Sequence, residues 1–318
     1  MLIFVLNAGS SSLKYQLIDI KSKELKASGL VERIGIDGIL KHEIGENKKL
    51  TFELPIPTHK EAIELVLRIL TNNETKVINS IDEIKAIGHR VVHGGEYFKG
   101  SAIVDDEVIR KIEELIPLAP LHNPANILGV KICKDLMPKV PNVVTFDTAF
   151  HQTMPMENFL YAVPYADYTE HHLRKYGFHG TSHYYVSQEA IKLLNKKDSK
   201  VIVCHLGNGS SVCAVKDGKS ISTSMGLTPL EGLVMGTRSG DIDAGVIPYL
   251  MEKKGLNHIQ ILDYLNKKSG ILGVSGVSSD LREVIKAAND GDKRSKIAIT
   301  MLCDRIKKYL CSYAGLMH

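Results

Sequence analysis

One short pattern occurs twice in the chain, and it constrains the fold more than any other feature of the sequence. Residues 6–12 read LNAGSSS and residues 206–212 read LGNGSSV, so Leu, Gly, Ser and Ser recur at matching places. Each copy follows an apolar segment of strand length and precedes a second strand-like segment. Because the strand context recurs together with the residues, we predict one strand–turn–strand unit built twice.

The first copy carries side chains that suit an anion. Asn7 ends the predicted strand 2–7, Gly9 and three serines follow it, and Lys14 lies at the start of the predicted strand 13–20. A P-loop does not fit, because the glycine spacing is absent and no helical pattern follows. Small residues let the backbone approach a ligand, and the polar groups offer donors to a phosphate. For this stretch alone, an ordinary Ser/Gly-rich turn with a solvated lysine is the alternative.

A pair of such turns has a consequence for ligand binding. If two phosphate-binding hairpins face each other across a cleft, a nucleotide can lie between them. The length of 318 residues predicts two domains, which we place at 1–150 and 151–318.

The composition excludes several classes of protein. Hydrophobic residues make up 44% and charged residues 24%, which is ordinary for a soluble globular protein. The formal charge of +4 is small, and no basic stripe interleaved with aromatic residues suggests nucleic acid. No apolar run has membrane-spanning length, and residues 2–6 are too short for a signal peptide. We therefore expect a cytoplasmic protein that binds neither nucleic acid nor membrane.

The five cysteines are widely spread, show no CxxC spacing and are odd in number. This argues against a disulfide framework and against a catalytic thiol, so we expect buried, unreactive thiols. They are Cys133, Cys204, Cys213, Cys303 and Cys311.

Periodicity and capping signals predict the remaining elements. Thr58 to Glu61 reads as a capping box before a helix from about Ala62, and Pro124 suits the first turn of a helix opening at Asn123. Further strands are expected at 24–33, 48–53, 84–92, 142–150 and 200–207. Further helices are expected from about 105, and at 166–174, 183–195, 245–253, 258–268 (stopped by Gly270), 279–290 and 293–312, the last with a core-facing stripe of Ile299, Leu302, Cys303, Ile306 and Leu310.

Functional side chains collect in short segments at the ends of these elements, where sites are usually assembled. Arg90, Arg238 and Lys14 offer cations, Asp147 offers a carboxylate, and His93, His122, His179 and His205 offer imidazoles. This set suits phosphoryl transfer, in which positioning and charge neutralisation supply most of the rate. A metal-dependent hydrolase is the alternative, because His179 and His183 lie four residues apart, as do His89 and His93. The absence of H-E-x-x-H disfavours it.

Seven segments in order also carry a family resemblance. They are NAGSSSLKY, GHRVVHGGE, PLAPLHNPAN, FDTAFHQTMP, RKYGFHGTSH, CHLGNGSSV and MGLTPLEGLVMGTRSGDIDAG. From Met1 to nearly the last residue, the chain resembles the acetokinases of the acetate and sugar kinase, Hsp70 and actin superfamily. The resemblance implies a duplicated RNase H-like α/β fold with a cleft between two domains. It further implies reversible transfer from ATP to acetate, a requirement for Mg²⁺ or Mn²⁺, and a homodimer.

The resemblance assigns roles to residues of this chain. Asn7 matches a position associated with magnesium, Arg90 matches the arginine that binds the substrate carboxylate, and Asp147 matches the essential acid. His179 and Arg238 match residues that stabilise the transferring phosphoryl group. The positions matching nucleotide contacts are Lys14, His205, Leu206, Gly207, Asn208, Gly209, Asp280, Leu281 and Arg282, and those matching an apolar pocket around the substrate methyl group are Val92, Leu121, Phe178 and Pro229.

Residue chemistry and resemblance together suggest direct in-line attack of an acetate oxygen on the γ-phosphorus. We expect Asp147 to orient an arginine or the substrate, because a carboxylate nucleophile has no proton to lose at neutral pH. A pocket around a methyl group separates homologous acids by only about 1–3 kcal/mol per methylene, so a propionate or butyrate kinase is an alternative.

The sequence departs from the family pattern at its end. Family members continue beyond the last helix with a strand, a Gly-rich loop and a glutamate associated with magnesium, whereas this sequence stops at His318. We therefore expect the second domain to be incomplete and the activity of the 318-residue chain to be severely reduced. The second alternative is accordingly a catalytically impaired remnant that binds nucleotide.

Overall fold

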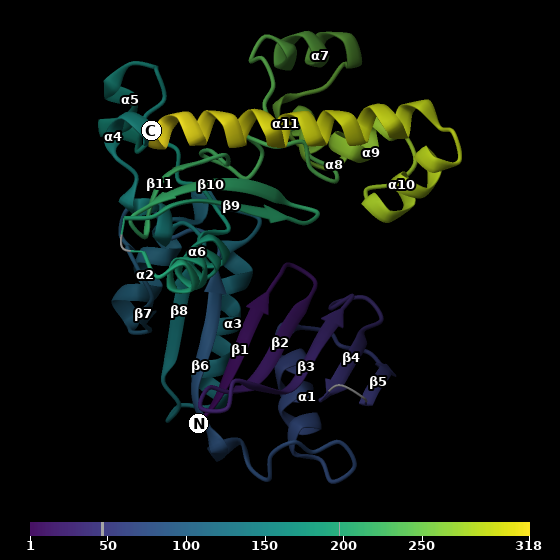
Figure 1. Cartoon of the computed structure of the whole chain (residues 1–318). Helices are drawn as coiled ribbons and strands as arrows, with labels where there is room; N and C mark the ends of the chain where they lie inside the picture. The colour runs from purple at the N-terminus through teal and green to yellow at the C-terminus, as the bar shows by residue number, and fades with distance from the viewer. Residues whose placement is uncertain (46–47, 197) are drawn as a thin grey trace. The chain divides into compact units, whose positions relative to one another are not determined.

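The computed structural model describes residues 1–45, 48–196 and 198–318 (Figure 1). The chain divides into two compact units, Met1–Ala149 and Phe150–His318. Each unit combines strands with helices, so the predicted α/β class is confirmed. The assignment of residues 1–150 and 151–318 as two RNase H-like domains stays a prediction.

Among its described residues, the first unit contains one sheet of eight strands in the order β5-β4-β3-β2-β1-β6-β8-β7. The strands are β1 (Leu2–Ala8), β2 (Leu13–Asp19), β3 (Glu24–Glu32), β4 (Ile39–Ile44), β5 (Lys48–Glu53), β6 (Ile84–Val91), β7 (Ala102–Ile103) and β8 (Asn142–Phe146). The helices are α1 (His59–Thr71), α2 (Asp106–Glu114) and α3 (Asn123–Leu136), with short 3₁₀ turns at Ile81–Glu83 and Ile116–Leu118.

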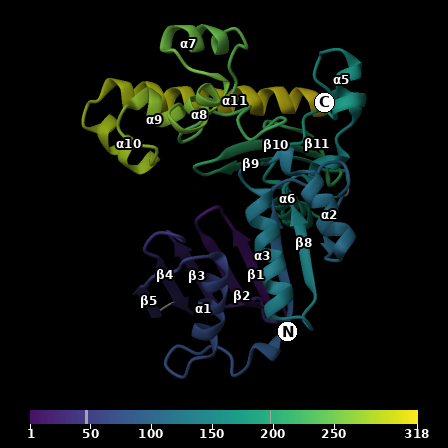
Figure 2. The ribbon, with the colours of Figure 1, turned by 180° about the vertical axis from the view of Figure 1, so that it is seen from behind.

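The topology of this sheet brings distant segments to one edge. Strands β1 to β5 form an antiparallel meander, and β6 then pairs in parallel with β1, as β8 does with β6. Helices α1 and α3 pack on one face of the sheet, as the two opposite views show (Figures 1 and 2). Leu6 pairs with His89, and Arg90 with Thr145. The carboxyl ends of the three parallel strands therefore meet, and they bring Asn7, Arg90 and Asp147 to the same edge.

Local signals account for the helices of this unit. Thr58 caps α1 by accepting from the Lys60 amide, and the apolar positions of α1 are buried against the sheet. The Thr58 hydroxyl also donates to the Glu61 carboxylate, which joins the two residues of the predicted capping box. Helices α2 and α3 begin as predicted, with Asp105 capping α2 and Pro124 in the first turn of α3.

In its described part, the second unit has a sheet of three antiparallel strands, in the order β11-β10-β9. These are β9 (Lys200–Leu206), β10 (Ser210–Lys216) and β11 (Lys219–Thr223). The helices are α4 (Met156–Phe159), α5 (Tyr165–His171), α6 (Gly180–Leu194), α7 (Val246–Lys254), α8 (His258–Lys267), α9 (Gly270–Ser275), α10 (Leu281–Asn289) and α11 (Lys293–Met317), and a 3₁₀ turn at Ala149–Thr153 joins the two units.

Alternate residues of β10 face two different layers. Val212 and Ala214 pack with Tyr313 and Met317 of α11, whereas Cys213 packs on the opposite side. Helix α6 contacts β9, and α11 contacts β10 and β9 (Figure 1). Odd-numbered residues of β10, including Ser211, therefore lie away from α11.

Both predicted hairpins are confirmed by their antiparallel pairing. Asp217 and Gly218, a dipeptide typical of hairpin turns, connect β10 to β11 with positive φ values of 51° and 76° that suit a two-residue hairpin. Two expectations were wrong. Gly270 begins α9 instead of stopping α8, and Cys204, Cys303 and Cys311 are exposed, whereas Cys133 and Cys213 are buried as expected. Strand β4 was not predicted. Among helices of the described residues, none has the length and apolar character needed to cross a membrane.

Candidate active site

Arg90 and Asp147 form a two-point ion pair at the edge of the first sheet. Arg90 Nε donates to Asp147 Oδ1 at 3.0 Å, and Nη2 donates to Oδ2 at 2.6 Å. The Asp147 side chain is 4% exposed and that of Arg90 is 42% exposed. Burial lowers the pKa of Arg90, but the hydrogen bonds and charge of Asp147 outweigh burial and raise it above its ordinary value. Because these bonds use Nε and Nη2, Nη1 stays available to an anion.

Two asparagines on the first turn of α3 fix the backbone around this pair. Asn126 accepts from the Val92 amide at 3.0 Å and donates to the Ala8 carbonyl at 2.7 Å. Asn123 accepts from the His93 amide at 3.2 Å and donates back to the His93 carbonyl at 3.1 Å. Both side chains are buried. The ends of β1 and β6 are thereby tied to one helix, which explains the asparagines of the PLHNPAN segment.

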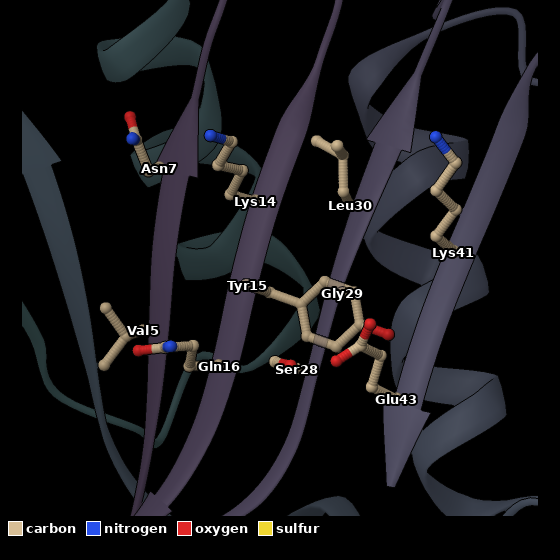
Figure 3. A pocket seen from close by; sticks show the side chains of 10 residues that line it. All are labelled: Val5, Asn7, Lys14, Tyr15, Gln16, Ser28, Gly29, Leu30, Lys41 and Glu43. Atoms are coloured by element: carbon tan, nitrogen blue, oxygen red, sulfur yellow. The ribbon is translucent and has the colours of Figure 1, made fainter. Parts of the chain in front are cut away.

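The first hairpin presents Asn7 and Lys14 next to each other on one face of the sheet, where they are register partners (Figure 3). They line a hollow of about 470 Å³ over strands β1 to β4, together with Gln16, Leu30 and Lys41. Lys41 is paired with Glu32 at 2.6 Å, whereas Lys14 has no ion pair with any described residue. The exposed ammonium of Lys14 can therefore contact an anion from outside the unit.

The two Gly-Ser turns differ more in structure than in sequence. Four residues, 9–12, connect β1 to β2, and three residues, 207–209, connect β9 to β10. Ser10 and Ser11 are consequently exposed in the first turn, whereas Ser210 and Ser211 belong to β10 and are buried. The repeated strand–turn–strand unit is present, but the matching serines have different surroundings in the two copies.

A second pocket, of about 380 Å³, lies beside the second hairpin. It brings Gly207 and Asn208 together with Asp280 and Leu281, which are some 70 residues away along the chain. Val234, Ile271 and Leu302 add apolar side chains to its lining. A volume of this size with apolar walls and a few polar groups is typical of a small-molecule site.

Other predicted nucleotide residues lie outside the lining of this pocket. Arg282 is 90% exposed and bonds back to Asp280 at 2.6 Å, and this side-chain hydrogen bond lowers the pKa of Asp280 to about 2. The ring of His205 stacks on His179 with centroids 4.1 Å apart. Leu206 is 57% exposed at the end of β9.

His179, Gly209 and Arg238 converge at the turn of the second hairpin. A Cβ built on Gly209 would lie 3.5 Å from Arg238 Nη1 and 3.6 Å from His179 Nε2. His179 precedes α6 with a φ of +58°, and its Nδ1 is 2.9 Å from the Ser211 hydroxyl. Arg238 Nη1 donates to the Pro229 carbonyl at 3.1 Å, and no described carboxylate forms an ion pair with this arginine. Burial lowers its pKa below the ordinary value, so the half-buried cation is suited to an anionic ligand.

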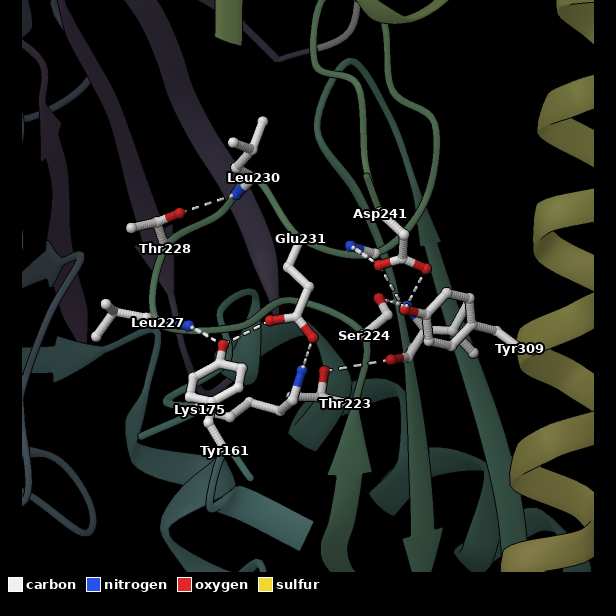
Figure 4. A network of polar contacts seen from close by, with 12 residues as sticks. Tyr161, Lys175, Thr223, Ser224, Leu227, Thr228, Leu230, Glu231, Asp241 and Tyr309 are labelled. Atoms are coloured by element: carbon white, nitrogen blue, oxygen red, sulfur yellow. Dashed lines mark hydrogen bonds and ion pairs between the residues drawn. The ribbon is translucent and has the colours of Figure 1, made fainter. Parts of the chain in front are cut away.

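Residues 224–245, which carry Pro229 and Arg238, form no helix or strand, and polar contacts hold them in place (Figure 4). Glu231 accepts from Tyr161 at 2.5 Å and pairs with Lys175. Asp241 accepts from the Gly232 amide at 2.8 Å and from the Tyr309 hydroxyl at 3.0 Å. The loop is thus attached to α11 at one end and to the segment before α6 at the other.

Comparison with known proteins identifies the family of this chain. The sequence model of the acetokinase family matches residues 2–318. The chain belongs to the acetokinase family. It is 56% identical over 318 residues to an acetate kinase of Treponema denticola and 54% identical over 321 residues to one of Caldanaerobacter subterraneus, and it covers 80% of each relative and 99% and 100% of itself.

Solved structures agree with this assignment. An acetate kinase of Porphyromonas gingivalis superposes with a TM-score of 0.96 at 48% identity, with 99% of this chain and 80% of that one covered. A propionate kinase of Francisella tularensis superposes with a TM-score of 0.93 at 45% identity over the same shares. The fold of this acetokinase is therefore that of acetate and propionate kinases.

The predicted site residues fall into separate groups in the two units. Arg90 and Asp147 are bonded to each other, and the neighbouring Val92 is buried whereas Leu121 is 73% exposed. In the second unit Phe178 is buried directly before His179, and Pro229 contacts Arg238. That Val92, Leu121, Phe178 and Pro229 share one pocket stays a prediction.

Three histidines of the two i,i+4 pairs bond to polar side chains of the protein. His179 and His183 both contact the hydroxyl of Ser211, and His89 bonds to the amide of Asn142 at 2.7 Å. Among the described residues, no three His, Cys, Asp or Glu side chains are grouped as metal ligands would be. Sequence reasoning missed Ser211, Asn123 and Asn126, although their segments had been singled out.

Proposed function

We propose that this acetokinase transfers the γ-phosphoryl group of ATP to acetate and gives acetyl phosphate and ADP in a reversible reaction. Its relatives at 54–56% identity are named acetate kinases, which supports the reaction. The observation that carries the proposal is the convergence of His179 Nε2 and Arg238 Nη1 on Gly209, beside the pocket at Asn208 and Asp280. Two donors next to a nucleotide-sized pocket suit a phosphoryl group.

The chemistry requires little more than positioning. A carboxylate oxygen of acetate attacks the γ-phosphorus in line with the departing ADP oxygen, so one P–O bond forms as another breaks. Arg90 would bind the acetate carboxylate through Nη1 while Asp147 holds its other two nitrogens. His179 and Arg238 would donate to oxygens of the moving group. Asp147 acts by orienting Arg90, because no proton has to be removed from the nucleophile.

A divalent cation would neutralise phosphate charge in this reaction. Asn7 offers one amide oxygen at the edge of the first sheet, and Lys14 lies opposite it. One neutral oxygen beside an ammonium cannot hold a free ion, but it suits Mg²⁺ or Mn²⁺ that arrives bound to the phosphates of ATP. We therefore propose Asn7 as a ligand of the nucleotide-bound cation. We also propose that the chain works as a cytoplasmic homodimer, as the family resemblance implies.

The acyl chain length decides between the proposed activity and the propionate or butyrate kinase alternative. Acetate, propionate and butyrate are supplied in turn with ATP and Mg²⁺, and the acyl phosphate is trapped as a hydroxamate. We expect the highest kcat/KM with acetate, falling about 10-fold or more per methylene if the methyl pocket is closely packed. A higher kcat/KM with propionate or butyrate would contradict the assignment. ATP binding without any acyl phosphate would favour the remnant.

A further inference from the structure

Ser211 lies at the centre of a buried histidine cluster in the second unit. Its hydroxyl is 2.9 Å from His179 Nδ1 and 2.7 Å from His183 Nε2, and it is fully buried on β10. The His183 ring lies against those of His151, His179 and His205, with centroids 5.7, 6.4 and 6.3 Å away. Two imidazoles therefore share one serine hydroxyl, and the position of each proton depends on the others.

The protons of this cluster can be counted. A serine hydroxyl has one hydrogen and two acceptor lone pairs, so it can donate to at most one of the two imidazoles. If it accepted from both rings, its own hydrogen would have no acceptor among the described residues, so we take it to donate to one ring and to accept from the other. His183 Nδ1 is buried and has no hydrogen-bond partner among the described residues. Burial lowers the pKa of His183 to about 2, so this ring is neutral and carries a single proton.

Two arrangements are compatible with these contacts. In the first, His183 carries its proton on Nε2 and donates it to Ser211, and Ser211 donates to Nδ1 of His179. In the second, every bond is reversed, and His183 holds its proton on Nδ1, where none of residues 1–45, 48–196 and 198–318 offers an acceptor. A buried N–H without an acceptor is rarer in proteins than a buried acceptor without a donor. The first arrangement also gives both rings the Nε2–H tautomer, which is the more stable one for a histidine side chain in water.

We infer that Ser211 is a positioning residue that fixes the proton of His179 on Nε2. This inference rests on the proposed function, because Nε2 is the atom that faces Gly209 and the guanidinium of Arg238. With its proton there, His179 donates a hydrogen bond to an oxygen of the transferring group. With the reversed arrangement, the same atom would present a lone pair to an anion, and the contact would be repulsive.

The tautomer can be measured in the unmodified 318-residue chain. Long-range ¹H–¹⁵N NMR of histidine-labelled protein distinguishes protonated from unprotonated ring nitrogens, and a His179→Gln variant assigns the His179 signals. We expect protonated Nε2 and unprotonated Nδ1. His151 is an internal reference, because its Nε2 must donate to the Phe178 carbonyl at 2.9 Å. Protonated Nδ1 with unprotonated Nε2 on His179 would overturn the inference.

Turnover tests the consequence of this arrangement. Ser211→Ala removes the donor to Nδ1, so we expect a mixture of His179 tautomers and a fall in kcat of about 10²-fold, with the KM for ATP nearly unchanged. Ser211→Thr keeps the hydroxyl and should recover most of the rate. Ser220→Ala is the matched control, since Ser220 is an equally buried serine that bonds to His151 at 2.8 Å and not to His179. We expect it to leave kcat and the His179 spectrum unchanged.

The outcomes separate the two proposals. Normal kcat in Ser211→Ala with an unchanged His179 spectrum would overturn the positioning role. If Ser211→Ala does not fold, the spectrum of the unmodified chain still decides the tautomer. The predicted tautomer in a chain that makes no acyl phosphate would contradict the proposed function and would leave the tautomer assignment standing.

Discussion

Replacing Asp147 with Asn isolates the contribution of the ion pair that holds Arg90. The carboxylate is almost fully buried and accepts two hydrogen bonds, at 3.0 and 2.6 Å, from Nε and Nη2 of Arg90. Asparagine has nearly the same shape, but it supplies one oxygen, and its NH₂ group would face an N–H of the arginine. The variant therefore loses one charge-assisted bond and gains a repulsive contact with little change in packing.

The magnitude follows from the exposure of the two partners. A hydrogen bond to a charged group contributes about 1.5–3 kcal/mol, and less where water can replace the partner. Because the Arg90 side chain is 42% exposed, we take about 2 kcal/mol for the loss of its orientation. If Arg90 binds the acetate carboxylate, this corresponds to a fall of about 30-fold in kcat/KM for acetate.

Initial rates over a range of acetate concentrations at saturating ATP and Mg²⁺ measure this effect. Asp37→Asn is the matched control, because Asp37 also accepts two bonds from an arginine, Arg33, but both side chains are more than half exposed. We expect the control to stay within about twofold of the unmodified chain. A kcat/KM for acetate within threefold of normal in Asp147→Asn, or an equal loss in both variants, would refute the reasoning.

Three further predictions concern other parts of the molecule. Arg238→Ala should reduce turnover by about 10²- to 10³-fold in the coupled assay, and near-normal turnover would remove this arginine from the mechanism. In Gly236→Ala the new Cβ overlaps the side chain of Asn208, which lines the proposed nucleotide pocket, so calorimetry should show a roughly tenfold higher Kd for ATP. Gly315→Ala is the control, because its Cβ meets open space, and its Kd for ATP should be unchanged. Burial lowers the pKa of four histidines, to about 4 for His89, His93 and His151 and to about 2 for His183. These rings take up protons only on unfolding, so the free energy of unfolding should fall as pH drops below about 6.5, by on the order of 1 kcal/mol per histidine per pH unit. Equal free energies of unfolding in urea at pH 6.5 and 5.5 would contradict this.

The elements that sequence predicted well are those with short-range signals. The Asp217–Gly218 turn, Pro124 in the first turn of α3 and Asp105 at the cap of α2 are decided by neighbours in sequence. Strand β4 and the six-residue helix α9 have weak local patterns. Pairing with β3 decides β4, and packing against α10 and α11 decides α9. Local chemistry therefore fixed the boundaries where caps and turns exist.

Burial was harder to predict than structure, because it depends on what packs against a residue. Cys303 lies in the apolar stripe of α11, yet only Ile299, Leu302, Ile306 and Leu310 of that stripe contact the core. Ser211 occupies the same place in the repeated sequence as Ser11. Because the second turn is one residue shorter, Ser211 belongs to a strand, whereas Ser11 lies in an exposed turn. A repeat in sequence indicates a repeated unit, and it does not guarantee that each side chain has the same surroundings.

Among the candidate site residues, sequence supplied the identities and the structure supplied their pairing within each unit. The contact between Arg90 and Asp147 follows from the parallel pairing of β6 and β8, which no local pattern states. Likewise, Asp280 and Asn208 line one pocket only because α10 packs near the second hairpin. The network of Glu231 and Asp241 had no sequence signal, since it holds an irregular loop through contacts with distant elements.

Phosphorus NMR of the 318-residue chain with ATP, Mg²⁺ and acetate tests the central claim most directly. If Arg90, His179 and Arg238 serve a direct transfer to a carboxylate, acetyl phosphate and ADP accumulate in equal amounts, and omission of acetate stops ADP formation. Formation of ADP with inorganic phosphate alone, at the same rate with and without acetate, would contradict the claim, because the γ-phosphoryl group would then have gone to water.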